Sequence, residues 1–185
     1  MPNKSKISST VSVEKYRTYE SNKDTLKISD FIYERFYERY INPFKDNKNK
    51  HGFSMLAIAC LMIESLETFK QGWKNSKNQS KKSFQLFFDD SIHLDNLKNI
   101  PDDFYTHIRC GLLHQAETTG GWHITRQEKQ LYHSESKTID ASLFFKAIEK
   151  EFEIYISNLK KSDWNSDIWK KARKKLSYIC EQTKA

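Results

Sequence analysis

The sequence predicts an all-α fold, on three observations. Hydrophobic residues make up 37% and aromatic residues 14% of the 185 residues, which is enough for the core of one domain. Five glycines and three prolines are too few for a sheet sandwich with many tight turns. Apolar residues recur every three or four positions over several long segments, which is the helical period. We therefore expect a four-helix bundle with a small inserted β-hairpin and a C-terminal basic helix.

The N-terminal third is predicted to hold a loose arm and two helices. Residues 1–27 are rich in Ser, Thr and Lys without a clear period, so a flexible arm is expected. The first helix should begin at Ser29, a plausible N-cap, and stop before Pro43. A second helix should follow Ser54 and end at Gly72; its first nine residues are apolar all round, so it should be central in the bundle.

The middle of the chain predicts a short helix, a long helix and a hairpin. The short helix covers "FQLFFDD", and Pro101 suits the first position of the third major helix, which should end near Glu117. The glycines of "TTGG" break that helix. The segments "WHITR" and "LYH" that follow are typical of two paired strands.

The last two helices have different characters. Asp140 should cap a helix with a helical apolar stripe that runs from Phe145 to Leu159. The predicted helical domain thus covers residues 28–160. Residues 161–185 should form a basic helix that packs on it through Ile168, Ala172, Leu176 and Ile179.

The positive charge of the chain indicates an anionic partner, with nucleic acid first. The net charge is +7 and the isoelectric point is near 9.2. From Lys160 onward, eight Lys or Arg residues stand against three Asp or Glu residues, so most of the net charge lies there. The candidate RNA-binding residues are Lys170, Lys171, Arg173, Lys174 and Lys175. The alternative, of equal weight, is a solvated face.

Cofactors and membranes are not expected from the sequence. Cys60, Cys110 and Cys180 are odd in number and far apart, which favours a reducing cytoplasm over a disulfide framework. The longest apolar run, residues 55–63, is well short of the ~20 residues of a membrane span. No glycine-rich phosphate loop and no paired cysteine ligands are present in the sequence, so we predict no cofactor and no metal.

The segment "IRCGLLHQAETTGGWHI" carries the candidate catalytic residues, Arg109 and His114. In a regular α-helix five positions correspond to a separation of roughly 140° around the axis, so these two side chains cannot easily meet within one copy. A second copy of the helix, related by a two-fold axis, can bring one chain's arginine toward the other chain's histidine. Gly111 would allow the close approach. The spacing therefore predicts a homodimer through this helix.

This segment, at the end of the third helix of a small helical protein, resembles the ribonuclease members of the HEPN superfamily. Those members carry an arginine, four to six residues and a histidine at this point, which here match Arg109 and His114. The resemblance covers roughly residues 29–160. It implies a dimeric, metal-independent endoribonuclease that leaves 2′,3′-cyclic phosphate and 5′-OH ends, in a bacterial defence or toxin role. It also allows a regulatory protein partner.

The roles implied by the resemblance agree with the chemistry of the residues. A histidine can accept and donate protons near neutral pH, which suits His114 to the proton transfers of RNA cleavage. Arg109 carries a permanent, forked positive charge for the phosphate oxygens. The sequence departs from the family pattern in two places. Cys110 follows the arginine where many members have a polar residue, and Ala116 stands where some members have a modified tyrosine.

Other interpretations remain open. The chain could be a catalytically silent HEPN-like module that binds RNA or a protein partner. His107, Cys110 and His114 share one helical face and could form part of a zinc site, although a fourth ligand is not evident. His114 could simply cap the C-terminal end of its helix. Glu64 and Glu67 could face solvent or pair with a basic residue.

Overall fold

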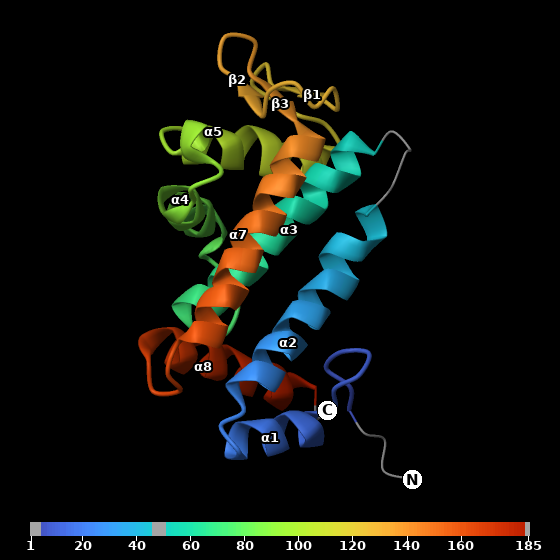
Figure 1. Cartoon of the computed structure of the whole chain (residues 1–185). Helices are drawn as coiled ribbons and strands as arrows, with labels where there is room; N and C mark the ends of the chain where they lie inside the picture. Colours follow the sequence, from blue (N-terminus) through green and yellow to red (C-terminus); the bar gives the residue numbers. More distant parts are fainter. Residues whose placement is uncertain (1–4, 46–50, 184–185) are drawn as a thin grey trace. The chain divides into compact units, whose positions relative to one another are not determined.

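The computed structural model describes residues 5–45 and 51–183, and most of them are helical, with one small three-stranded sheet (Figure 1). In chain order the elements are α1 (Val13–Ser21), α2 (Thr25–Phe36), the π-helical η1 (Tyr37–Ile41), the 3₁₀ turn η2 (Asn42–Phe44), α3 (Gly52–Gln71), α4 (Ser80–Asp90), the 3₁₀ turn η3 (Asp95–Leu97), α5 (Pro101–Phe104), the π-helical η4 (Tyr105–Cys110), α6 (Gly111–Gln115), β1 (His123–Thr125), β2 (Tyr132–His133), β3 (Thr138–Asp140), α7 (Ala141–Lys161) and α8 (Asp167–Gln182). The predicted helical class is confirmed.

The chain divides into two compact units. The terminal unit consists of residues up to 43, residues 68–75 and residues from 153 onward. The central unit consists of residues 44–67 and 76–152. Each unit therefore combines segments that are far apart in the sequence, and each is described by itself below.

The N-terminal segment is a helix with buried side chains, so the prediction of a loose arm over residues 1–27 is wrong where the structure describes it. Ser12 caps α1, because its hydroxyl accepts the backbone N–H of Lys15. Ile7, Val11 and Tyr16 are buried. These apolar residues are too few to form a local period, and they are buried through tertiary contacts instead. Residues 1–4 of the predicted arm lie outside the described residues.

Helix α2 begins before the predicted N-cap. Asp24 is the cap, and its carboxylate accepts the backbone N–H of Lys27 at 3.0 Å. Ser29, the predicted cap, is buried inside the helix, where its hydroxyl donates to the carbonyl of Thr25 at 2.7 Å. Both residue types suit an N-cap, so the sequence alone does not distinguish them.

Helix α3 agrees with the predicted long central helix, except that it begins at Gly52. Gly72 follows it with a φ of +66°, a conformation that favours glycine. This helix is long and apolar enough to cross a membrane, but 61% of its most apolar window is buried inside the fold, as in the core helix of a soluble protein. Phe53 and Leu61 are nevertheless exposed, so the helix is not covered on every side.

The sheet differs from the predicted hairpin. Strand β3 lies between the other two; β1 pairs with it in parallel and β2 pairs with it antiparallel. The segments "WHITR" and "LYH" therefore do not pair with each other, because Ile139 of β3 takes the buried central position. The predicted cap of the next helix is confirmed, since a carboxylate oxygen of Asp140 accepts the backbone N–H of Leu143 at 3.0 Å.

An aromatic cluster in the central unit holds the helix that carries Arg109 and His114. Phe104 is fully buried, and its ring centroid lies 5.2 Å from that of Phe88, 5.1 Å from that of Phe144 and 6.0 Å from that of Trp122. Such ring contacts stabilise beyond the area they bury. The N-terminal end of this helix is therefore anchored in the core.

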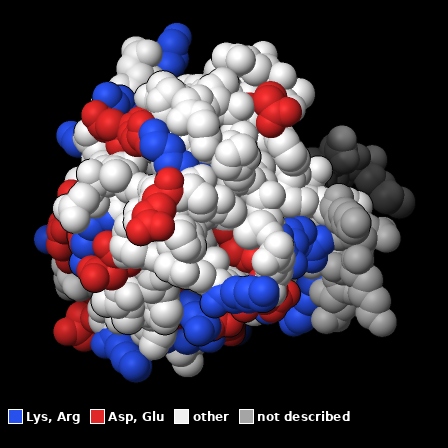
Figure 2. Space-filling view, turned by 90° about the horizontal axis from the view of Figure 1, so that it is seen from above, with Lys and Arg blue, Asp and Glu red and all other residues white. Residues whose placement is uncertain are grey.

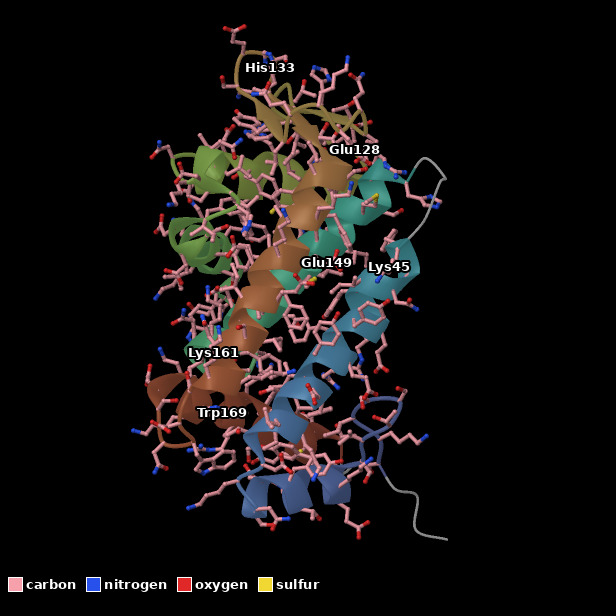
Figure 3. All side chains as sticks on the ribbon, in the orientation of Figure 1. Lys45, Glu128, His133, Glu149, Lys161 and Trp169 are labelled. Carbon is pink, nitrogen blue, oxygen red and sulfur yellow. The ribbon has the colours of Figure 1, made fainter. Side chains whose placement is uncertain are left out.

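Helix α8 packs through a face rotated slightly from the predicted one, since Ala172 and Leu176 are buried as predicted. Its buried residues are Trp169, Ala172, Leu176 and Cys180, so Ile168 and Ile179 are not at the centre of the contact. Trp169 lies below the C-terminal end of α7 (Figure 3). Its indole N–H is close to the carbonyls of Leu159, at 2.9 Å, and Ser162, at 3.2 Å. The large indole decides the packing face, because its buried N–H finds acceptors there.

Candidate active site

The helix of Arg109 and His114 starts at Pro101 as predicted, but it is not a regular α-helix. Its middle, Tyr105–Cys110, is π-helical, and Arg109 lies in this segment. Ala116, with a φ of +54°, is in the left-handed region and ends the helix. Short π-helical segments within helices occur frequently at functional sites. The sequence contains no local signal for this change of helical type.

Arg109 forms a partly buried ion pair with Glu64 of α3. Its Nε donates to the Oε1 of Glu64 at 2.8 Å, and the two side chains are only 15% and 7% exposed. The guanidinium also lies 5.5 Å from the ring centroid of Tyr105. Burial opposes the charged form of Arg109, but the hydrogen bond and charge of Glu64 outweigh it and raise the arginine's pKa. Of the two alternatives for Glu64, pairing with a base is the one observed.

The outer end of the Arg109 guanidinium is available to a ligand. Within the described residues, Glu64 is the only carboxylate that pairs with it, and Cys110 is the other side chain that forms a hydrogen bond with it. These two partners leave N–H donors of the guanidinium over. The Nε of Arg109 is occupied by Glu64, so its orientation is set. Arginine recognises phosphate through parallel N–H donors, which is the part of the side chain left free here.

His114 is exposed and separate from Arg109. In the described part of the chain it makes no hydrogen bond and no ion pair. The residues from Gly111 to Gln115 are α-helical, so the angular separation expected for a regular helix applies to most of the interval between His114 and Arg109. One copy of the chain therefore presents the two candidate catalytic residues without bringing them together.

The loop after His114 folds back along the helix. The backbone N–H of Thr119 donates to the carbonyl of His107 at 3.0 Å, and the Thr119 hydroxyl lies 2.8 Å from Nδ1 of the same residue. A Cβ on Gly111 would lie 2.5 Å from the carbonyl oxygen of Glu117. Gly111 thus allows a close approach of this chain's own loop, whereas the sequence predicts a close approach of a second copy.

His107, the first candidate ligand of the alternative zinc site, forms its contacts with this loop and with Asp103 instead. The Nδ1 of His107 lies against Thr119, and its Nε2 is 3.4 Å from Asp103. Among residues 5–45 and 51–183, no group of three His, Cys, Asp or Glu side chains is arranged to hold a metal ion. His107, Cys110 and His114 share a helical face in the sequence pattern, but they do not form a ligand set.

The five predicted RNA-binding residues of α8 have unequal environments. Lys171 pairs with Asp167 at 2.9 Å. Arg173 lies over the Trp164 ring at 4.2 Å from the centroid and donates to the Trp164 carbonyl. Lys175 is partly buried and donates to a backbone carbonyl.

Lys170 and Lys174 are the exposed members of this group. Neither forms an ion pair or hydrogen bond within the described residues. On the face that Figure 2 shows, basic and acidic side chains are interspersed among the described residues, without a large patch of one sign. Of the five predicted residues of α8, only Lys170 and Lys174 are thus both exposed and without a hydrogen bond or ion pair in the described part of the chain.

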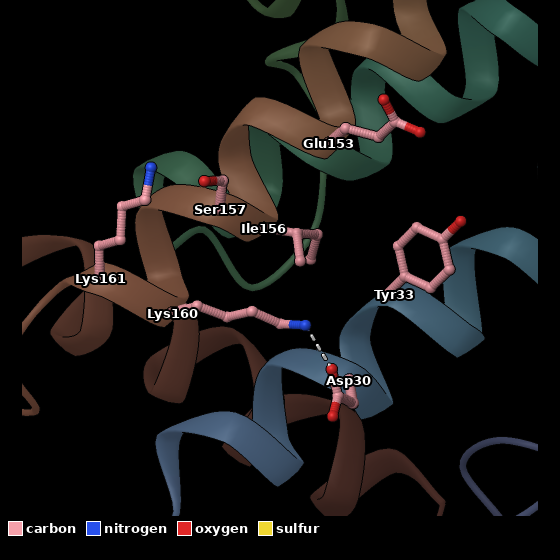
Figure 4. A pocket seen from close by; sticks show the side chains of 7 residues that line it. All are labelled: Asp30, Tyr33, Glu153, Ile156, Ser157, Lys160 and Lys161. Atoms are coloured by element: carbon pink, nitrogen blue, oxygen red, sulfur yellow. Dashed lines mark ion pairs between the residues drawn. The ribbon is translucent and has the colours of Figure 1, made fainter.

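A pocket in the terminal unit was not predicted from the sequence. It has a volume of about 540 Å³, between α2 and the last turns of α7 (Figure 4). The Nζ of Lys160 and the Oδ1 of Asp30, which both line it, form an ion pair at 2.6 Å. Its lining residues are Asp30, Tyr33, Glu153, Ile156, Ser157, Lys160 and Lys161. The two acidic and two basic side chains balance, so the pocket does not favour an anion.

No protein-family model, curated protein or solved structure matches this chain. The fold and the site alone define its class, which is a small, mainly helical protein with a carboxylate-held arginine and an exposed histidine on one helix.

Proposed function

We propose that this protein is a metal-independent endoribonuclease with a HEPN-like helical bundle, active as a homodimer. The observation that carries the proposal is the state of Arg109. Its Nε is held by Glu64 at 2.8 Å, and it has no second carboxylate partner in the described part of the chain. An exposed histidine, His114, follows on the same helix. This is the combination of a positioned phosphate binder and a proton-transfer group that RNA cleavage needs.

The reaction uses two histidines and no metal. One His114 takes the proton of the 2′-OH, and the resulting oxygen attacks the adjacent phosphorus. The bond from phosphorus to the 5′-oxygen breaks, and the second His114, in its protonated form, donates a proton to that oxygen. Arg109 donates its free N–H groups to the phosphorane oxygens, where negative charge develops. The products are a 2′,3′-cyclic phosphate and a 5′-OH end.

The second histidine comes from a second copy of the chain. Leu61 lies one turn before Glu64 on α3, and Leu113 lies one turn after Arg109; they are 40% and 38% exposed. An exposed leucine thus lies close in sequence to each member of the ion pair: Leu61 on the helix of Glu64, and Leu113 on the helix of Arg109. A two-fold contact that covers them would bring both copies of Arg109 and His114 to one interface.

We expect Leu61→Asp to dissociate this dimer and to reduce cleavage with it, because the substitution places a charge in an apolar contact. Leu61 is already exposed in one copy, so the fold of each chain should be unchanged. Sedimentation velocity at micromolar concentration measures the change. Leu26→Asp is the matched control, since Leu26 is 58% exposed but lies on α2. A Leu61→Asp protein that sediments and cleaves like the wild type would contradict this interface.

The experiment that tests the proposed activity is incubation of the protein with single-stranded RNA in excess EDTA. We expect cleavage, with products that carry 2′,3′-cyclic phosphate and 5′-OH ends. Inhibition by EDTA, or products with 5′-phosphate, would contradict the mechanism. The cellular role that accompanies the proposal is a cytoplasmic bacterial defence or toxin-type effector, controlled by a regulatory protein partner.

A second candidate function is a catalytically silent module that binds RNA. The observation in its favour is the exposure of Lys170 and Lys174, which lie one turn apart on α8 without partners in the described residues. Both cations can reach neighbouring phosphates of one strand. Binding of this kind is independent of sequence, because phosphates carry no base information.

We expect the double substitution Lys170→Gln and Lys174→Gln to weaken RNA binding and to flatten its salt dependence. Each lost phosphate contact should lower the log–log salt slope by roughly 0.7 on a single strand. The cleavage proposed for Arg109 and His114 should not change at saturating RNA, because neither of these residues is altered. Lys171→Gln is the control and should have a smaller effect, since Asp167 already neutralises Lys171. An unchanged slope in the double variant would identify this face as solvated surface only.

A further inference from the structure

Two arginines of α2 converge on one neutral acceptor in the terminal unit. Arg35 and Arg39 lie one turn apart, and both donate to the backbone carbonyl of Ile7, with Arg39 at 3.1 Å. Arg35 has no carboxylate partner among the described residues, and Arg39 has only Glu38, at 3.7 Å. A carbonyl satisfies a hydrogen-bond donor but does not neutralise its charge. Two guanidinium charges are therefore held together with one carboxylate, that of Glu38, beside them.

A lysine of α8 adds a third charge in the same unit. The Nζ of Lys175 donates to the carbonyl of Lys74 at 2.7 Å, again a neutral acceptor. Burial, together with the positive charge of Arg35, lowers the pKa of Lys175 to about 8. Burial, together with the charge of Arg39, lowers the pKa of Arg35 to about 10. The charge of Arg39 thus acts on Arg35, and the charge of Arg35 acts on Lys175.

The acidic groups around this cluster are few. Glu38, Tyr40 and Cys180 act on Arg35, and the Tyr178 ring lies 5.6 Å from the Nζ of Lys175. Of these groups, only Glu38 is a carboxylate, and it also accepts the backbone N–H of Ser9 at 3.2 Å. The cluster keeps a net positive charge when its members are protonated.

We propose that Arg35, Arg39 and Lys175 form a binding site for a phosphoryl group. A multiply charged anion removes the mutual repulsion of partly buried cations, and the arginine forks suit phosphate oxygens. Arg35 keeps N–H donors beyond the one that Ile7 accepts. In the pocket of Figure 4, by contrast, Lys160 is already paired with Asp30. The site does not depend on cleavage by Arg109 and His114, and it accepts either a free phosphate compound or an RNA backbone.

Calorimetric titration of the whole protein with pyrophosphate at pH 8 tests the site, in two buffers of different ionisation enthalpy. Lys175 is about half protonated at that pH, given the pKa near 8. A bound anion raises this pKa, so the protein should take up as much as roughly half a proton per anion. The difference in heat between the two buffers measures the net proton exchange. The same titration of Lys175→Arg gives the part that comes from pyrophosphate itself, which is still partly protonated at this pH.

Three variants distinguish the site from general surface charge. Arg35→Met should weaken binding by roughly tenfold or more, the effect of one lost charge-assisted contact. Lys175→Arg should keep the affinity but lose the proton uptake, because arginine stays charged at pH 8. Lys150→Met, an exposed lysine of α7 that belongs to neither proposed site, is the control and should bind and take up protons like the wild type.

Parallel titrations with a short single-stranded RNA identify the source of the phosphoryl group. If pyrophosphate binds and Arg35→Met weakens this binding, the natural ligand is a small phosphate compound. If only the RNA binds and Arg35→Met weakens that binding, the ligand is a nucleic-acid backbone. The proposal is overturned if neither ligand binds, if folded Arg35→Met binds both like the wild type, or if Lys175→Arg keeps the full proton uptake. Thermal melting confirms the fold of each variant, and cleavage assays in parallel report separately on Arg109 and His114.

Discussion

Replacing His114 with alanine should abolish RNA cleavage and leave the fold intact. General acid–base catalysis by a positioned side chain contributes roughly 10²- to 10⁴-fold, and both proton transfers use this residue. His114 is exposed and has no hydrogen bond or ion pair in the described part of the chain, so its removal leaves no buried group unsatisfied. Cleavage rates under single-turnover conditions in EDTA, together with thermal melting, provide the measurement.

His133→Ala is the matched control for this variant. His133 is also an exposed histidine of the central unit, at the sheet, as Figure 3 labels it. Its loss should leave cleavage unchanged. If His114→Ala cleaved RNA at the wild-type rate, the proposed catalytic role would be wrong, and the silent binding module would remain. Loss of cleavage in both variants would point to a general effect of histidine removal and would contradict the assignment as well.

Replacing Glu64 with alanine should destabilise the protein and should also reduce cleavage, because Arg109 loses the ion pair that orients it. Removal of one member of a largely buried ion pair costs about 3–5 kcal/mol, because the other charge stays desolvated without a partner. Glu64 is 7% and Arg109 15% exposed, so little of this effect is screened by solvent. Chemical denaturation measures the free energy of unfolding, and cleavage assays at a temperature where the variant stays folded measure the loss of activity.

The double variant Glu64→Leu with Arg109→Leu separates stability from activity. Replacing both members of a buried ion pair by apolar residues is often neutral or stabilising, so most of the lost stability should return. Cleavage should stay absent, because the phosphate binder is gone. Arg109→Lys should fold and cleave poorly, since a point charge does not reproduce the forked contact. A Glu64→Ala variant that is as stable as the wild type and cleaves RNA normally would show that the ion pair does not position Arg109.

Much of the helical layout follows from the sequence alone. The apolar stripe from Phe145 to Leu159, the cap at Asp140 and the proline at 101 predict helix positions that the structure confirms. These signals are local, because a helix buries one face and its caps satisfy its own backbone groups. The sequence does not predict strand β3 or the N-terminal helix α1, because neither is long enough to show a local period.

The environment of each candidate site residue was decided by tertiary structure. The sequence singled out Arg109 and His114 by their spacing and their place at a helix end, but Glu64 joins Arg109 across 45 positions of the chain. The sequence pattern gives Lys174 and Lys175 of α8 the same role, whereas the structure exposes Lys174 and partly buries Lys175, whose Nζ donates to the carbonyl of Lys74. The period of the apolar residues determines which face of a helix is buried. The charged residues that meet at that face come from segments distant in the sequence, and their contacts leave no local pattern.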